Sequence, residues 1–385
     1  MKITYIVETL AYKGGAERII SEKMNYLADL HGYEVTVVTL FQKPHETPNV
    51  YYLSDRVRQI DLQIPAHLQY KHRYPRRLWV KWQYSRMLRR KLTETITALA
   101  PDVIVGMGFA SADVVCKLKT TAAKVIESHE ARRFTMSNAQ HTGRSPLTRP
   151  FGSLYRLLYL HTIERHADAV VALTTGDAAE WHRARRVEVI PNFSTMSVTA
   201  TSLCENKKVI AVGRFEWQKG YERLLDVWET VGPKHPDWQL DIYGEGPLYT
   251  DIQQEIDSRK LSTIALHPFT PDISSKYTES SVCVLTSHYE GFSLVLLEAM
   301  RHGLPSVSFD CPHGPSSVLA DGECGYVVED GNIGLFAEKL CQLIEHPETR
   351  KAFSAAAVKR AQIFSQKDIM RQWVALFESL SQNYS

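Results

Sequence analysis

The chain has 385 residues, of which 44% are hydrophobic and 23% are charged, a balance typical of a soluble globular protein. This length is too great for one ordinary core and predicts roughly two domains of about 150 to 200 residues each. The net charge of +2 divides unevenly, because residues 1–192 carry +10 and the remaining residues carry −8. We therefore expect the two halves to meet different partners.

Short sequence features argue against membrane-spanning, secreted, zinc-binding and disulfide-rich proteins. No uninterrupted apolar run approaches the roughly 20 residues of a membrane-spanning helix, and the apolar run at residues 3–7 is too brief for a signal peptide. Six scattered cysteines without a C-x-x-C pair indicate reduced, buried thiols and argue against a zinc site or a disulfide framework. We expect a cytoplasmic protein, either free or bound peripherally to the inner face of the cytoplasmic membrane.

The first half of the chain alternates predicted strands and helices. A strand at 2–8, the loop TLAYKGG, a helix from Ala16 to about Leu30 and a strand at 33–40 form a βαβ unit. Such units build parallel sheets that are covered by helices on both faces. Further buried strands are predicted at 102–106, 123–127 and 168–173.

The pattern restarts after a turn at 191–192. Strands are predicted at 207–215, 238–244, 263–267 and 282–286, and helices at 221–231, 248–260, 293–302, 334–346 and 348–360. We predict two doubly wound Rossmann-like domains facing across a cleft, one formed by residues 1–192 and the other by residues 193–366. Residues 367–385 contain an amphipathic helix that can pack back on the first domain. Ligands of such sheets bind beyond the carboxyl ends of the strands.

Two cations follow the first strand of the second half. Arg214 follows the strand residues Val209 to Val212 in VGRFEWQKG, and Lys219 lies five residues further on. Arginine offers a bidentate fork and lysine a point charge, so the pair suits a diphosphate. The alternative is an ordinary solvated pair in a loop.

A second motif, HYEGFSLVLLE, joins a predicted strand to a helix that starts near Ser293. Unpaired amides at Gly291, Phe292 and Ser293, together with the helix dipole, form an anion site. Glu290 precedes this start, and Glu298 lies two helical turns further on, where an ionised carboxylate needs a partner. A ligand along the helix start could meet both carboxylates, although a neighbouring protein group could equally satisfy Glu298.

The order GRFEWQKG, YGEGP, EGFSLVLLE and DGECGYVV resembles the nucleotide-sugar domain of family-4 retaining glycosyltransferases with the GT-B fold. Their E-x7-E motif corresponds to Glu290 and Glu298. The early GGAER and the later VEVIPNF are similar to the same family's first-domain loop and interdomain strand. The loop CPHGP is similar to the branch that builds bacterial capsule, O-antigen or lipid-linked glycans. The resemblance covers nearly the whole chain.

The resemblance implies that residues 1–192 bind the acceptor and that residues 193–366 bind the nucleotide-sugar donor. It also implies a role for each matched residue. Arg214 and Lys219 would neutralise the donor diphosphate, Glu298 would accept the ribose hydroxyls, and Glu290 would bind the transferred sugar. The backbone amides of Gly291, Phe292 and Ser293 would hold the sugar and the phosphates. The remaining implied contacts are the approach of Gly14 and Gly15 to the diphosphate and backbone contacts of Phe269 and Thr270 with the base.

His129 follows the predicted strand at 123–127 and matches a family residue near the anomeric carbon. It would hydrogen-bond a sugar hydroxyl, unless it is a capping or core histidine. With Glu290, Arg214 and Lys219 it completes the expected catalytic set. The resemblance implies retention of configuration.

Fixed cations are expected to do the work of a metal here. The chain contains no Asp-x-Asp motif, so we predict no metal and no cofactor beyond the nucleotide-sugar cosubstrate. A hydrolase with two opposed carboxylates is disfavoured because Glu290 and Glu298 lie at one helix start. His267 and Pro268 stand where relatives usually have a small residue, which leaves the base and sugar open.

Residues 71–91 contain nine lysines and arginines and no acid, with the aromatic residues Trp79, Trp82 and Tyr84 interleaved among them. A basic amphipathic helix of this kind is typical of binding to an anionic membrane surface. An alternative of equal weight is a solvated helix that covers the first sheet. Binding of nucleic acid is disfavoured because no known nucleic-acid motif is present.

The sequence therefore predicts an enzyme that moves a hexose or N-acetylhexosamine from a nucleotide diphosphate, with UDP as the expected nucleotide. The expected acceptor is a membrane-associated or lipid-linked glycan. The alternative is a catalytically silent protein that binds nucleotide sugars, against which the complete set of Arg214, Lys219, Glu290 and Glu298 argues.

Overall fold

The computed structural model describes residues 1–42, 49–65, 71–73, 76–129, 131–132 and 149–382. The chain forms two compact units. The first unit comprises residues 1–173, 177–190 and 370–385, and the second unit comprises residues 174–176 and 191–369. The domain bounds expected from the sequence were 1–192, 193–366 and 367–385.

The first unit contains a seven-stranded sheet in the order β3-β2-β1-β4-β5-β6-β7. Every described strand pairing in this sheet is parallel. The strands are β1 (Lys2–Val7), β2 (Glu34–Thr39), β3 (Arg58–Asp61), β4 (Val103–Met107), β5 (Ala123–Ser128), β6 (Ala169–Ala172) and β7 (Val187–Val189). The central strands are nearly continuous apolar runs because helices cover both faces of the sheet.

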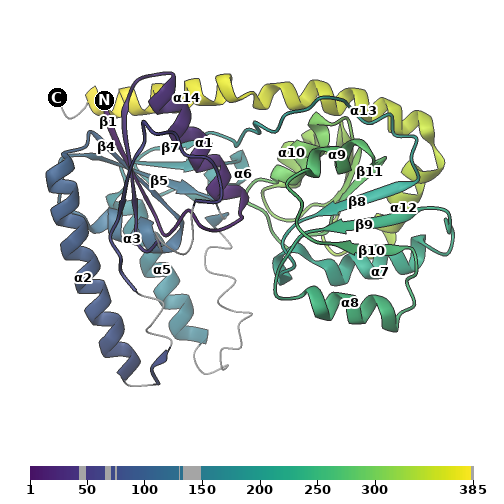
Figure 1. Ribbon diagram of the computed structural model, residues 1–385, viewed down its shortest axis with the longest axis horizontal. Helices are drawn as coiled ribbons and strands as arrows, with labels where there is room; N and C mark the ends of the chain where they lie inside the picture. The colour runs from purple at the N-terminus through teal and green to yellow at the C-terminus, as the bar shows by residue number, and fades with distance from the viewer. Residues whose placement is uncertain (43–48, 66–70, 74–75, 130, 133–148, 383–385) are drawn as a thin grey trace. The chain divides into compact units, whose positions relative to one another are not determined.

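Helices lie on both faces of the first sheet (Figure 1). One face packs against α2 (Arg76–Leu99), α3 (Gly108–Lys117) and α5 (Arg149–His166), which contribute Leu92, Val115 and Ile163 to its core. The other face carries α1 (Gly15–Asp29) and the end of α14 (Gln366–Gln382). The short α6 (Thr175–Glu180) follows β6.

The second unit contains a six-stranded sheet in the order β10-β9-β8-β11-β12-β13, and its described pairings are also parallel. The strands are β8 (Lys208–Val212), β9 (Gln239–Tyr243), β10 (Ile264–His267), β11 (Val282–Leu285), β12 (Ser306–Phe309) and β13 (Gly325–Val328). The chain builds outward from β8 to β10 and then returns to β11 on the other side of β8. Strand order therefore reverses between β8 and β11.

Alternate residues of β8 face opposite layers of helices. Val209 and Ala211 pack toward α7 (Tyr221–Val231), α8 (Tyr249–Ser258) and α12 (Ile333–Glu345). Ile210 packs toward α9 (Ile273–Thr278) and α10 (Leu294–Arg301). The remaining helical elements are α11 (Pro315–Val318), α13 (Pro347–Ala361) and the 3-10 turns Trp217–Lys219, Ala320–Gly322 and Gln362–Phe364.

This architecture confirms the predicted pair of doubly wound Rossmann-like sheets. The six cysteines are all buried and unbonded to one another. The sequence patterns did not predict β3, β12, β13 or α9, which are only four to six residues long and therefore leave little periodic signal. Within the described residues, no helix is both long enough and apolar enough to span a bilayer.

Candidate active site

The loops that follow β8 and β11 leave the second sheet at the point where its strand order reverses. The carboxyl ends of these two neighbouring strands lie at one edge of the sheet because the strands are parallel. In doubly wound sheets this reversal point is the usual place for a ligand. Arg214 and Lys219 follow β8, and Glu290 follows β11, so the fold brings both predicted motifs to this edge.

Lys219 and Glu290 form a direct ion pair. The Lys219 Nζ lies 2.8 Å from the Glu290 Oε1, and their side chains are only 16% and 7% exposed. The Ser287 hydroxyl donates to the same oxygen at 2.7 Å. Among the described residues no hydrogen bond reaches the other oxygen, Oε2. Glu290 is therefore held firmly through one oxygen and keeps the second as an acceptor.

The two loops are also joined through their backbones. The His288 amide donates to the Gln218 carbonyl at 2.8 Å, and the Gln218 side chain donates to the Tyr289 carbonyl at 3.1 Å. The Thr286 hydroxyl donates to the Lys219 carbonyl at 3.2 Å. These bonds hold the loop after β8 against the loop after β11 and so fix the position of Lys219 beside Glu290.

Gly220 lets the two loops approach this closely. Its φ is +61°, and a Cβ at this position would lie 2.2 Å from the Thr286 carbonyl oxygen. Gly331 has a φ of +80° with open space around it. Only a residue without a Cβ fits position 220, because both the conformation and the space exclude a side chain.

We expect Gly220→Ala to lower the free energy of unfolding by about 1 to 3 kcal/mol and to displace Lys219. Gly331→Ala is the matched control, since it introduces a positive φ without a clash. Urea denaturation of both variants measures the difference. Equal losses in the two variants would contradict the close approach at Gly220.

The loop after β12 also touches Glu290. A Cβ on Gly314 would lie 2.6 Å from the Glu290 Cβ, so the backbone of the CPHGP segment packs directly on this side chain. Burial, and then the nearby Glu290 charge, raises the pKa of the Cys311 thiol and of the Tyr221 hydroxyl. Both groups therefore stay neutral at physiological pH, and the negative charge here resides on Glu290.

Arg214 takes a different position from Lys219. Its guanidinium lies 3.2 Å from the Glu216 carboxylate, and its side chain is 51% exposed. The sequence predicted Arg214 as a cation beside the diphosphate and did not anticipate this local pair. An exposed pair of this kind is weak, so a phosphate could replace the Glu216 contact.

Glu298 lies on α10 and is buried, as the motif spacing predicted for a helix that starts near Ser293. The Tyr277 hydroxyl donates to its Oε2 at 3.2 Å. The Ser293 hydroxyl caps the helix by accepting from the Leu296 amide. Tyr277 on α9 is therefore a protein partner of the buried carboxylate, whereas its contact with a ribose stays a prediction.

The other predicted donor contacts of the second unit lie at the same sheet edge. Gly291 and Phe292 are buried at the start of α10, and the Phe292 ring meets Phe364 edge-on at 5.5 Å. Phe269 and Thr270 follow β10, two strands from β8, and the Phe269 ring is 44% exposed. The structure thus spreads the predicted contacts along the carboxyl ends of β10, β8 and β11.

Gly14 and Gly15 begin α1 in the first unit. Gly14 is the N-cap residue and offers no side chain to cap the helix, so the amides of the first turn lack a side-chain partner from that residue. A Cβ on Gly14 would collide with the Glu17 carboxylate at 2.1 Å. The approach of these glycines to a diphosphate stays a prediction.

His129 is part of a buried charged network in the first unit. Its Nε2 lies 2.9 Å from the Glu127 Oε2, and the same oxygen accepts from the Lys23 ammonium of α1. The Trp373 ring of α14 covers that ammonium at 4.2 Å. A carboxylate only accepts hydrogen bonds, so the His129 Nε2 carries the proton and its Nδ1 is the remaining polar atom of the ring.

Burial raises the pKa of the Glu127 carboxyl, but Lys23 and His129 outweigh burial and lower it to about 2. Burial lowers the pKa of Lys23, and Glu127 opposes that change. Glu127 has two positive or donating neighbours, whereas Lys23 has one carboxylate. The carboxylate is therefore the firmly ionised member of this network.

Lys23, Glu127 and Trp373 were not predicted as site residues. A signal for Lys23 existed, because it lies among Ile19, Ile20 and Met24 on the apolar face of a helix, where a lysine needs a partner. The partner itself comes from β5, 104 residues away in the chain. Ser287, Gly220 and Gly314 were likewise missed.

Residues 76–91 of the basic segment 71–91 belong to α2, residues 71–73 precede that helix, and residues 74–75 lie outside the described chain. Val80 and Leu92 are buried, and Leu92 packs into the core beside the first sheet, whereas Trp79 and Trp82 are 57% and 54% exposed. Lys81 lies over the Tyr155 ring of α5 at 5.5 Å. One face of α2 thus covers the sheet, and another presents tryptophans and cations.

Two family profiles match the chain. "Glycosyltransferase Family 4" matches residues 13–194, and "Glycosyl transferases group 1" matches residues 201–360. An uncharacterized glycosyltransferase of Haemophilus influenzae is 25% identical over 384 residues, which cover 97% of this chain and 98% of that protein. The amylovoran biosynthesis glycosyltransferase AmsD of Erwinia amylovora is 36% identical over 171 residues, 44% of this chain and 47% of AmsD.

Solved structures share the whole fold. A Staphylococcus aureus TarM variant, solved with fondaparinux, α-GlcNAc-glycerol and UDP, superposes with a TM-score of 0.76 at 17% identity, over 98% of this chain and 99% of TarM. The lipopolysaccharide outer core galactosyltransferase WaaB superposes with a TM-score of 0.71 at 19% identity, over 98% of this chain and 100% of WaaB.

The two matched profiles and the paired Rossmann-like sheets define a glycosyltransferase with the GT-B fold, and the chain belongs to that class. Two of the similar proteins, AmsD and WaaB, are named for amylovoran biosynthesis and for the lipopolysaccharide outer core.

Proposed function

We propose that the chain transfers a hexose or N-acetylhexosamine from a UDP-sugar to a membrane-associated or lipid-linked glycan, with retention of configuration. The single observation that carries this proposal is the Lys219–Glu290 pair at the strand reversal of the second sheet. A fixed cation and a sugar-binding carboxylate meet there beside the amino end of α10. The UDP bound to TarM supports uracil as the base.

The cations would act on the leaving nucleotide. Negative charge grows on the diphosphate as the bond to the sugar breaks, and preorganised cations stabilise that charge most strongly at the transition state. Lys219 is held in place by Glu290 before the donor arrives, so little reorganisation is needed. Arg214 would leave Glu216 and add a bidentate contact to the phosphates.

The carboxylates would bind the two ends of the donor. Glu290 would use its Oε2 to accept a hydrogen bond from a hydroxyl of the transferred sugar. Its negative charge would stabilise the oxocarbenium-like centre. Glu298, with Tyr277 on its Oε2, would accept the ribose hydroxyls. The amides of Gly291 to Ser293 would face the sugar and phosphates, and the segment at Phe269 and Thr270 would contact the base.

His129 would contribute from the first unit. Because its Nε2 is tied to Glu127, the Nδ1 is the atom that would hydrogen-bond a sugar hydroxyl. Glu127 and Lys23 would orient the ring without touching the sugar. No metal is assigned to this reaction, in keeping with the fixed cations.

A panel of UDP-, GDP- and ADP-sugars tests the donor. A ligand that binds only the native state raises the melting temperature, so UDP-sugars should give the largest shift. Turnover of that donor should then depend on a lipid-linked acceptor. The absence of any shift across the panel would refute the proposed donor site. A shift without turnover over a broad acceptor panel would instead support a silent nucleotide-sugar-binding protein.

We also propose that α2 meets an anionic membrane where the acceptor resides. The exposed apolar residues on α2 and the neighbouring α5 are Leu78, Trp79, Trp82, Met87, Tyr155, Leu157 and Leu158. Exposed cations accompany them, and the Arg86 guanidinium lies 4.8 Å from the Trp82 ring. Each cation near anionic lipid contributes about 1 kcal/mol.

The double variant Trp79→Ala/Trp82→Ala should therefore bind vesicles of phosphatidylglycerol at least about tenfold more weakly, since two amphipathic rings leave the interface. Sedimentation with vesicles measures this loss. Leu203→Ala, which removes an exposed apolar residue from the second unit, is the control and should not change binding. Equal binding by all three proteins would argue for a merely solvated helix.

A further inference from the structure

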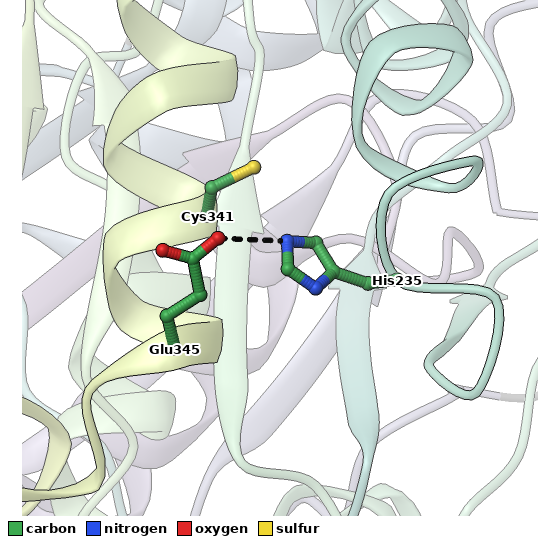
Figure 2. A group of neighbouring side chains, drawn as sticks. All are labelled: His235, Cys341 and Glu345. Carbon is green, nitrogen blue, oxygen red and sulfur yellow. Dashed lines mark ion pairs between the residues drawn. The ribbon is translucent and has the colours of Figure 1, made fainter.

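A second group of chemically active side chains lies away from the strand carboxyl ends of the second unit. His235 is in the turn between α7 and β9, and Cys341 and Glu345 are on α12. Their ligand atoms all lie within 4.8 Å of one another. Figure 2 shows the imidazole facing the helix, with the carboxylate and the thiol on the side that it approaches.

His235 is the least satisfied member of this group. Its Nε2 is buried and has no hydrogen-bond partner among the described residues, although the Glu345 Oε1 lies only 3.3 Å away. The side chain of His235 is 14% exposed, so bulk water reaches it poorly. A buried ring nitrogen without a hydrogen bond is uncommon in native structures and calls for a specific explanation.

The three donors form a suitable set for a divalent zinc-class cation. One thiolate and one carboxylate neutralise a charge of +2, and a neutral imidazole completes the set without adding charge. Sulfur and imidazole ligands favour zinc over magnesium or calcium, which prefer oxygen. Glu345 is 52% exposed, so a water molecule can supply the fourth ligand of a tetrahedral site.

The position on α12 also favours a cation. Cys341 and Glu345 are four residues apart, so they share one face of the helix. The helix ends at Glu345, and Cys341 lies about one turn before that end. The negative end of the helix dipole therefore points toward the site. Burial raises the pKa of the Cys341 thiol and Lys234 opposes that change, while the charge of Lys234 also repels a metal.

We propose that His235, Cys341 and Glu345 bind one zinc ion. Binding replaces the thiol proton of Cys341 with a zinc–sulfur bond and releases that proton. The ion joins the turn before β9 to the end of α12. Because His235 precedes the amino end of β9, the site lies at the opposite edge of the sheet from Lys219 and Glu290. The proposed zinc therefore stabilises the second unit and takes no part in sugar transfer.

Zinc titration of the full-length protein after removal of metals by a chelator tests the proposal. A competing chromophoric indicator should report one tight equivalent of Zn²⁺, and Co²⁺ should give a sulfur-to-cobalt charge-transfer band. Loss of an outer partner of a metal site weakens affinity about 10- to 100-fold. Loss of a direct ligand in Cys341→Ser or His235→Ala should weaken it at least about 100-fold and abolish the cobalt band.

Two further variants keep the test decisive. Glu345→Gln changes an exposed side chain, so it tests the site even if a change at the buried Cys341 prevents folding. His346→Ala removes the exposed histidine next to the site and should bind Zn²⁺ as the unaltered protein does. Zinc should raise the melting temperature of the unaltered protein and of His346→Ala, but not that of the variants that lack a ligand. Failure to bind one equivalent, or undiminished binding by Glu345→Gln and His235→Ala, would overturn the proposal.

Discussion

Replacing Lys219 with alanine should lower kcat/KM for sugar transfer about 10²- to 10³-fold, the usual loss when one preorganised group is removed from a developing negative charge. Most of the loss should appear in kcat, because the charge on the leaving nucleotide is greatest at the transition state. Steady-state transfer from the UDP-sugar identified by the donor panel provides the measurement.

Lys207→Ala is a suitable control for this variant. Lys207 also pairs with an acid, Asp237, but both side chains are more than half exposed and far from the strand carboxyl ends. Its loss should leave kcat unchanged. Similar rates for Lys219→Ala and the unaltered enzyme would remove Lys219 from the catalytic groups.

Replacing Lys23 with methionine should destabilise the first unit by about 3 to 5 kcal/mol. Breaking a buried ion pair from one side leaves an uncompensated charge, here the carboxylate of Glu127. The double variant Lys23→Met/Glu127→Gln removes both charges and should recover much of the loss. Thermal or urea unfolding followed by circular dichroism measures both effects. A loss below about 1 kcal/mol, the range of exposed pairs, would contradict a buried pair.

The same pair predicts a dependence on pH. The pKa of Glu127 is lowered in the folded protein from its ordinary value of 4.5 to about 2. Its stabilising contribution is therefore fully present above about pH 4.5 and is lost as the pH falls toward 2. Glu127→Gln should flatten the acid limb of the stability curve. An unchanged acid limb would mean that other carboxylates dominate acid unfolding.

The carboxyl-end motifs could be predicted because parallel sheets impose a simple geometry. Lys219 and Glu290 are 71 residues apart in the chain, yet each lies in the connection that follows a strand, and neighbouring parallel strands end at the same edge. Strand periodicity and two loop motifs were therefore enough to bring these two residues together. The family resemblance gave them their expected roles.

The partners of the buried charges could not be predicted in the same way. Glu127 meets Lys23 only because β5 and α1 are stacked in a particular register, which local patterns do not specify. Tyr277 meets Glu298 from α9, whose six residues are too few to show helical periodicity. Arg214 pairs with Glu216, two residues away, through a side-chain rotation that no sequence pattern reports.

Contacts within each unit hold a predicted site residue in place. In the second unit, loops from three strands hold Glu290 through Lys219, Ser287 and the backbone at Gly314. In the first unit, a buried ion pair orients His129. Each arrangement is complete without a ligand, so the proposed donor would meet groups that are already in place.

Calorimetric titration with UDP, without any acceptor, tests the central claim most directly. The unaltered protein should bind one UDP in the second unit, and Lys219→Ala and Arg214→Ala should each bind it at least about tenfold more weakly, a loss of about 1.4 kcal/mol. Lys207→Ala should bind it normally. Undiminished UDP affinity in both of the first two variants would contradict a diphosphate site between β8 and the amino end of α10.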